Sequence, residues 1–226
     1  MSGSPLSVFA TARQKMVDGQ VRPSDVTDIR IIDAMLAVPR EAFVPPTLRK
    51  MAYLDIDLDV SAAGSSKRYL IKPVVIARML QAAGVSPTDN VLVVGCATGY
   101  VAAVVSRLAG QVTATESDAT LATAAGANLA MLGYSNVVVE TGAAADGCIQ
   151  NAPYDVILID GATEIEPDGL YRQLAPEGRL VGVFATTNPQ RAVLVARSHD
   201  DFGSRALFDA TAPVLPGLER PAAFVF

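Results

Sequence analysis

The residues with the clearest chemical potential surround a glycine turn in the middle of the chain. Val91–Val94 is an uninterrupted apolar run, and Gly95-x-x-x-Gly99 follows it directly. Such a run indicates a strand buried on both faces. A turn that leads from this strand into a helix leaves backbone N–H groups beside a gap where a nucleotide-like ligand can lie.

An acid at the end of the next apolar segment strengthens this interpretation. Residues 111–116 are predicted to form a strand that ends in Glu116, about 20 residues after the turn, where ribose-binding carboxylates occur. A carboxylate at that place can accept hydrogen bonds from both ribose hydroxyls. Turn and acid together predict a nucleoside site; the alternative is that the glycines serve packing alone.

The turn favours S-adenosylmethionine (SAM) over a dinucleotide. A dinucleotide fingerprint reads G-x-G-x-x-G, but Ala97 and Tyr100 stand at the second and third glycine positions. A pyrophosphate needs the close backbone approach that those glycines permit, whereas SAM has no phosphate. An NAD-dependent oxidoreductase is therefore the disfavoured alternative. The candidate cofactor contacts in the turn are Gly95, Cys96, Ala97, Gly99 and Tyr100.

A second acid is placed to meet the same ligand. Asp160 ends the predicted strand 154–160, and ligands of open α/β sheets bind beyond the carboxyl ends of the strands. Asp160 is a candidate contact for the methionyl ammonium of SAM or for the substrate, or it caps the following turn.

Cys96 and Cys148, the only cysteines, are too few for a zinc site, and no metal is expected.

The elements that position these residues follow a strand–helix alternation after residue 90. The predicted strands are 91–95, 111–116, 136–141, 154–160 and 178–184, and the predicted helices are 99–109, 118–132 and 167–174. This alternation predicts an α/β fold with a mostly parallel, doubly wound sheet. Before it we expect helices at 27–38 and 73–83 and a strand at 53–60; after it, strands at 192–198, 205–210 and 222–226.

Composition narrows the class of protein. The chain has 226 residues, of which 50% are hydrophobic and 18% charged, enough for a large core. Its net charge of −5 has the wrong sign for a general nucleic-acid binder, so no nucleic-acid partner is expected. No segment suggests a signal peptide or a membrane span, and cysteine is scarce, so we expect a soluble protein of the cytoplasm.

Several sequence blocks resemble one family of class I SAM-dependent methyltransferases, the protein-L-isoaspartate O-methyltransferases. The similarity covers most of the chain and is most specific in the N-terminal part. The blocks are Met16-Val17-x-x-Gln20, Val38-Pro39-Arg40-Glu41-x-Phe43-Val44-Pro45, Ala52-Tyr53-x-Asp55, the 91–100 turn, Leu132-Gly133-x-x-Asn136-Val137 and Gly178-Arg179-Leu180-Val181.

The resemblance implies both a fold and a function. It implies a Rossmann-like, seven-stranded sheet with an antiparallel C-terminal strand, preceded by an N-terminal helical cap. Residues 1–84 would then form the cap and substrate loop, and 85–226 the SAM-binding domain, in one compact unit. The implied activity is methyl transfer from SAM to a free carboxylate of a damaged protein or peptide, as in protein repair.

The chain departs from the family where the substrate and the adenine should bind. The family's Gly-Gln-Thr-Ile-Ser segment precedes a proline; aligned on Pro73, its Ser position is Ile71 and its Thr position Tyr69. The family's Asp in Gly-Asp-Gly is Ala143. No catalytic residue can therefore be assigned, and Lys72, in a loop with Lys67 and Arg68, is the candidate substrate contact. A different methyl acceptor and a non-catalytic SAM-binding protein remain alternatives.

Overall fold

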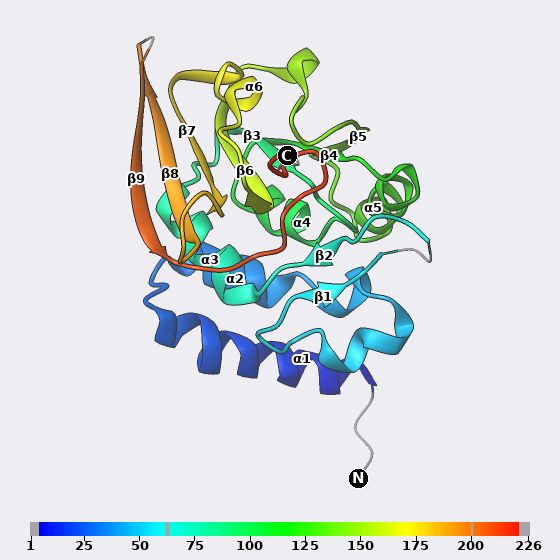
Figure 1. Cartoon of the computed structure of the whole chain (residues 1–226). Helices are drawn as coiled ribbons and strands as arrows, with labels where there is room; N and C mark the ends of the chain where they lie inside the picture. The colour runs from blue at the N-terminus through cyan, green and yellow to red at the C-terminus, as the bar shows by residue number, and fades with distance from the viewer. Residues whose placement is uncertain (1–4, 62–63, 200, 222–226) are drawn as a thin grey trace.

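A seven-stranded sheet runs through the protein, with the strand order β5-β4-β3-β6-β7-β8-β9 (Figure 1). The computed structural model describes residues 5–61, 64–199 and 201–221. The strands are β3 (Asn90–Val94), β4 (Gln111–Glu116), β5 (Val137–Thr141), β6 (Tyr154–Thr163), β7 (Leu174–Phe184), β8 (Arg191–Ser198) and β9 (Asp201–Asp209), and a separate pair is β1 (Leu58–Asp59) with β2 (Tyr69–Leu70).

The sheet has a parallel half and an antiparallel edge. Strands β5, β4, β3, β6 and β7 are parallel, whereas β8 and β9 are antiparallel additions beside β7. The predicted α/β class with a mostly parallel sheet is confirmed. The antiparallel part contains two strands rather than one, and the strand predicted at 222–226 lies outside the described residues.

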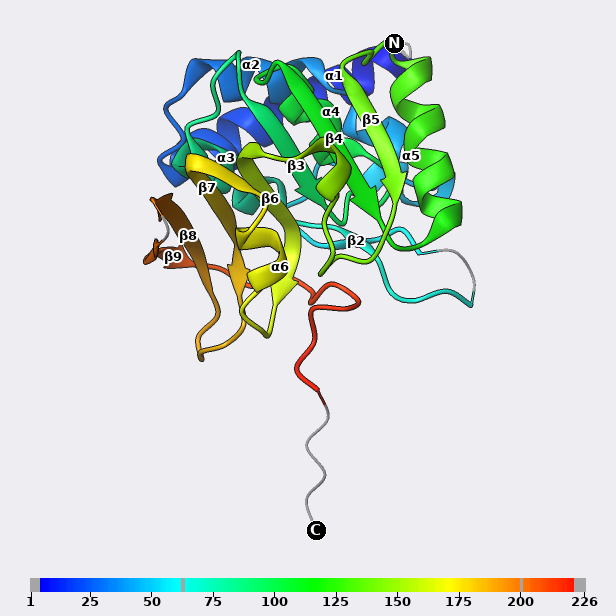
Figure 2. The ribbon, with the colours of Figure 1, turned by 90° about the horizontal axis from the view of Figure 1, so that it is seen from above.

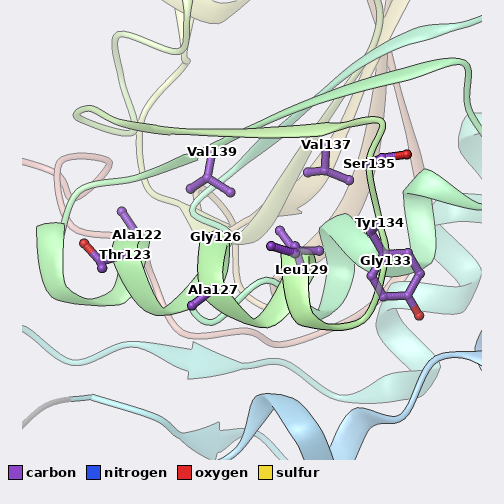
Figure 3. Close-up of a pocket in the computed structure, with 11 residues that line it drawn as sticks. Ala122, Thr123, Gly126, Ala127, Leu129, Gly133, Tyr134, Ser135, Val137 and Val139 are labelled. Carbon is purple, nitrogen blue, oxygen red and sulfur yellow. The ribbon is translucent and has the colours of Figure 1, made fainter.

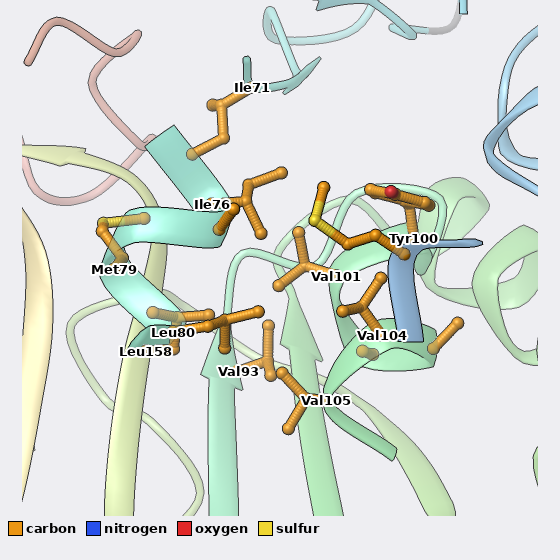
Figure 4. Packing of buried hydrophobic residues seen from close by; sticks show 14 of the residues in the cluster. Ile71, Ile76, Met79, Leu80, Val93, Tyr100, Val101, Val104, Val105 and Leu158 are labelled. Atoms are coloured by element: carbon orange, nitrogen blue, oxygen red, sulfur yellow. The ribbon is translucent and has the colours of Figure 1, made fainter. Parts of the chain in front are cut away.

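Most helices lie on one side of the sheet (Figure 1). They are α1 (Pro5–Met16), α2 (Ile29–Ala37), α3 (Pro73–Ala83), α4 (Tyr100–Ser106) and α5 (Ala119–Met131), with short helical turns η1 (Val17–Val21), η2 (Arg22–Ser24), η3 (Arg40–Phe43) and η4 (Pro46–Met51). Of these, α3, α4 and α5 pack against the strands, and α1 and α2 pack against other helices. In Figure 4, Ile76 and Leu80 of α3 pack beside Val101 and Val105 of α4. Residues on both sides of position 84 contribute to this one cluster, and the division there stays a prediction.

Shorter segments cover the opposite face. They include the single-turn helices η5 (Ile149–Asn151) and α6 (Asp168–Tyr171). Leu170 and Tyr171 of α6 belong to a second hydrophobic cluster, whereas Ile149 of η5 is exposed. The chain after β9 also returns across the sheet (Figure 2). Its Val214 forms a parallel bridge with Ala162 of β6, and Leu215 and Leu218 are buried in the second cluster. This C-terminal segment, residues 210–221, therefore passes over the carboxyl edge of the parallel strands.

The strand predicted at 53–60 is mostly wrong. Only Leu58–Asp59 pairs, with β2, and the expected core residues Leu54 and Ile56 are exposed. The alternating acids have another role: Asp57 accepts from the Lys72 N–H at 3.0 Å, and Asp55 accepts from the Val74 N–H at 3.3 Å. They satisfy orphan N–H groups at the start of α3, which is a contact that periodicity does not reveal.

Candidate functional site

The glycine turn lies at the carboxyl edge of β3, as predicted, and is tied to β4. Gly95 has a φ of +77° and Gly99 a φ of +99°. The N–H groups of Gly95 and Cys96 donate to the carbonyl of Thr115 at 2.8 and 2.9 Å. Those two groups are thus used by the neighbouring strand. Ala97 also adopts a positive φ of +49°, which is strained for a residue with a side chain.

Glu116 stands beside this turn, but Arg68 occupies its carboxylate. The Arg68 Nη2 lies 2.7 Å from Glu116 Oε2, its Nε lies 3.0 Å from Oε1, and both side chains are buried. Glu116 also accepts from the Ala97 N–H at 2.7 Å and the Asp118 N–H at 3.1 Å. A carboxylate has about four acceptor sites, so this set leaves none for ribose hydroxyls.

This environment fixes the ionisation of Glu116. Burial alone would raise the pKa of Glu116, but the hydrogen bonds and charge of Arg68, with N–H groups of Asp118 and Ala97, outweigh it and lower the pKa. The Arg68 Nη2 donates in addition to the Gly95 carbonyl at 2.7 Å. Arg68 is therefore held by charge-assisted bonds to both the acid and the turn.

Leu215 fills the rest of the crevice from the C-terminal segment. A Cβ placed on Gly95 would lie 2.7 Å from Leu215 Cδ1, and one placed on Gly161 would lie 2.6 Å from Leu215 Cδ2. The segment is held to β6 by the Ala162 N–H donating to Pro213 at 2.8 Å and the Leu215 N–H donating to Ala162 at 2.9 Å. Two glycines of the crevice are thus packed directly against a leucine.

The remaining space does not fit a nucleoside. The gap among Arg68, Gly95, Ser117, Gly142, Ala144 and Leu215 offers about 0 Å³ to a water molecule. Small-molecule sites usually have roughly 300–1,000 Å³. The gap between Arg68 and Leu215 is therefore too small for the adenosine of SAM, and the acid predicted to bind the ribose is already paired; a separate cavity of about 400 Å³ adjoins this gap at Gly142.

Asp160 lies on the same edge and is fully buried. Neither of its carboxylate oxygens has a hydrogen-bond partner among the described residues. Burial raises the pKa of Asp160 to about 7, against the charges of Arg68 and Arg40, which act to lower it. Buried polar groups are usually paired, so an unpaired carboxyl group marks this edge as unusual.

The other predicted site residues have different surroundings. Tyr100 is buried and packs edge-on against Phe43, with Arg40 Cζ 4.5 Å from its ring centre. Ala143 is exposed, and Ile71 is buried at 1% exposure and contacts the helical core (Figure 4). Gly99 caps the start of α4.

The basic residues of the 67–72 loop do not form one cluster. Lys67 pairs with Asp59, Arg68 is buried on Glu116, and Lys72 lies 3.1 Å from Thr211 Oγ1 and 3.7 Å from Asp57 Oδ2. Each of the three cations thus has its own acceptor.

A wider cavity lies away from these groups. It has about 560 Å³ and lies between α5 and β5, where Gly126, Leu129 and Val139 line it (Figure 3). Its lining contains neither Glu116 nor Asp160 and no charged side chain.

Among the helices of the described residues, none is both long and apolar enough to cross a membrane.

Comparison with known proteins decides the family. The sequence model of the protein-L-isoaspartate(D-aspartate) O-methyltransferases matches residues 11–210. The chain belongs to this family. A protein-L-isoaspartate O-methyltransferase of Koribacter versatilis is 41% identical over 182 residues, which cover 80% of each protein.

Solved structures agree with this assignment. A protein-L-isoaspartate O-methyltransferase superposes with a TM-score of 0.81 at 25% identity, covering 92% of this chain and 67% of the other. A Plasmodium falciparum protein described by the same activity, in complex with S-adenosyl-L-homocysteine, has the same fold, with a TM-score of 0.75 at 15% identity and coverages of 92% and 98%. The predicted family, fold class, enzyme class and methyl donor are confirmed at the level of the family, whose cofactor is SAM.

The two residues that close the crevice were missed by the sequence interpretation. The sequence places Arg68 with Lys67 and Lys72 in a loop that either contacts the substrate or is solvated, and it does not predict the pairing with Glu116, although the alignment on Pro73 places Arg68 at the family's Gln, a neutral residue. Leu215 lies beyond the matched residues 11–210 and had no recognisable pattern. The Arg68 substitution was the one available signal, because a cation so close to the turn has Glu116 as an obvious partner.

Proposed function

We propose that this chain is a SAM-dependent O-methyltransferase that acts on carboxylates of damaged proteins or peptides, of the isoaspartyl type. The observation that carries the proposal is the family match across residues 11–210. The position of Glu116 at the edge of β4, beside the Gly95 turn, supports it.

The chain needs no general base for this reaction. A substrate carboxylate with a pKa near 4 is ionised at neutral pH and is already a nucleophile. Catalysis then depends on positioning, which can supply about 7–11 kcal/mol. Because Ile71 replaces the family's Ser, we assign the acceptor contact to Lys72, whose ammonium is partly exposed between Asp57 and Thr211.

A methyl-transfer assay tests the proposal. Labelled SAM is incubated with the full chain and either an isoaspartyl peptide or its normal aspartyl counterpart. We expect label on the isoaspartyl peptide alone. Label on neither peptide, under conditions where S-adenosyl-L-homocysteine binding is measured, would contradict the function. Full activity in Lys72→Glu would remove Lys72 from the acceptor contact.

We further propose that the methyl acceptor is a protein or peptide and that the protein works in the cytoplasm. The acidic chain, with a net charge of −5, supports a protein or peptide acceptor rather than nucleic acid. Sparse cysteines support the reducing cytoplasm. Salt-independent activity on a peptide and failure to retard a DNA duplex in a gel are the expected results.

A second candidate is a family member that no longer transfers methyl groups. The specific observation in its favour is the buried Arg68–Glu116 pair, which uses the acid that should hold the ribose. The same assay separates the two candidates, because the second predicts no label on any carboxylate peptide.

A further inference from the structure

The cofactor crevice of this chain is filled by the chain's own side chains. Arg68 reaches Glu116 from the loop before α3, and Leu215 reaches Gly95 and Gly161 from the C-terminal segment. The two side chains come from segments far apart in the sequence, and both meet at Gly95. A Cβ there would lie 2.9 Å from Arg68 Nη2 and 2.7 Å from Leu215 Cδ1.

We propose that Arg68 and Leu215 hold the crevice closed, so that SAM and its demethylated product bind only after both side chains have left. The inference rests on the proposed function for the identity of the ligand alone. The polar occupant, a guanidinium, replaces the ribose diol at Glu116. The apolar occupant, an isobutyl group, takes space beside the two glycines.

An unpaired polar group at this edge indicates that Arg68 and Leu215 can be displaced by a ligand and are not ordinary core residues. In a core shaped only for packing, buried polar groups are paired. Here both oxygens of Asp160 lack a partner within the described part of the chain, although Asp160 is next to Gly161, which Leu215 contacts. The edge thus keeps a buried polar group that the present occupants do not satisfy.

The C-terminal segment is also attached in a way that permits release. Its backbone contacts with β6 and the following turn are the Ala162–Pro213, Leu215–Ala162 and Glu164–Leu218 hydrogen bonds. It follows β9, the outer strand of the sheet, and contributes no strand to the seven. Its departure would break the isolated Val214–Ala162 bridge but leave the pairings among the seven strands intact.

Calorimetric titration with S-adenosyl-L-homocysteine tests the proposal on the full-length chain. The variants are Arg68→Gln, Leu215→Ala and the double variant. The matched control is Arg107→Gln, which removes an exposed positive charge directly after α4. We expect at least tenfold tighter binding by the double variant than by the unaltered chain, with smaller gains for each single variant and none for the control.

Two results would overturn the proposal: equal affinity of the unaltered chain and the double variant, or no binding by either. Circular dichroism and thermal melting establish that each variant is folded. Should Leu215→Ala fail to fold, Arg68→Gln alone decides, because its gain is expected independently. A double variant that binds the product yet labels no isoaspartyl peptide would reject the proposed function and leave the closed crevice standing.

Discussion

At the scale of single residues, Asp160 has the least compensated burial in the described chain. It is 1% exposed and neither oxygen accepts a hydrogen bond there. Its pKa is raised to about 7 by burial, whereas an unfolded aspartate titrates near 3.9. The folded state therefore binds more protons than the unfolded state between those two pH values, and stability falls as pH rises through this window.

Asp160→Asn is expected to flatten that dependence. When the pH rises from about 5 to about 8, ionisation of Asp160 should lower the unfolding free energy of the unaltered protein by roughly 2–3 kcal/mol. The neutral amide of asparagine does not ionise, so the variant should not show this loss. Urea denaturation at the two pH values measures the difference. Asp201→Asn, at an exposed position, should keep the original slope. A variant at Asp160 with an unchanged slope would show that the carboxyl group titrates normally.

The sequence located the two site acids but not their surroundings. Glu116 and Asp160 were predictable because each ends an apolar run near the carboxyl end of a strand, although β6 itself continues to Thr163, and such ends meet at one edge of a parallel sheet. The pairing of Glu116 with Arg68 joins positions 48 apart, and no periodicity encodes such a contact. The same holds for Leu215, whose place depends on the path of the whole C-terminal segment.

At the scale of elements, Gly84 and Gly126 allow the effect of backbone conformation on stability to be measured apart from the effect of packing, because both have open space where a side chain would lie. Gly84 ends α3 with a φ of +60°, and Gly126 lies inside α5 without a positive φ. A Cβ on either would contact nothing within 4 Å. Any change in stability on substitution must therefore come from the backbone.

Gly84→Ala and Gly126→Ala are expected to act in opposite directions. The first forces alanine into a left-handed conformation and should cost about 1 kcal/mol. The second removes flexibility from a helix interior and should add about 0.5–1 kcal/mol. Chemical denaturation of the two variants beside the parent protein measures both. The same sign for both variants would contradict the assigned backbone conformations.

Elements with strong local patterns were predicted well. The helix predicted at 73–83 is α3, because proline starts it and glycine ends it, and 111–116 is β4. The predicted helix 167–174 shrinks to Asp168–Tyr171, since Leu174 already pairs with Tyr154 as the start of β7. Tertiary pairing, which a local pattern does not contain, decided that boundary.

At the scale of the whole molecule, Arg40 joins the N-terminal helical turns to α3 and α4. It is fully buried, and its guanidinium donates to the carbonyls of Ala52 at 2.9 Å and Ile71 at 2.9 Å. Its Cζ also lies over the ring of Tyr100 in α4. One side chain thus connects η3, the loop after η4, the start of α3 and α4.

Arg40→Leu is expected to destabilise the protein by about 3 kcal/mol. The substitution leaves buried carbonyls without a donor, and each such group costs roughly 1–3 kcal/mol. Arg49→Leu, at an exposed site in η4, should change stability by less than about 0.5 kcal/mol. Equilibrium unfolding of both variants measures the contrast. A loss below about 1 kcal/mol for Arg40→Leu would mean that these bonds contribute little.

The reactivity of Cys96 can measure how often the crevice opens when no ligand is present. Its thiol is buried within the turn that Arg68 and Leu215 cover, and burial, with the nearby Glu116 and Asp160, raises the pKa of Cys96. A thiol in that state is inert to alkylating reagents until the region opens. The rate at which iodoacetamide alkylates Cys96, measured by the mass of the peptide that contains it, would therefore report how often the region opens. If this rate reaches a plateau at high reagent concentration, the plateau equals the opening rate.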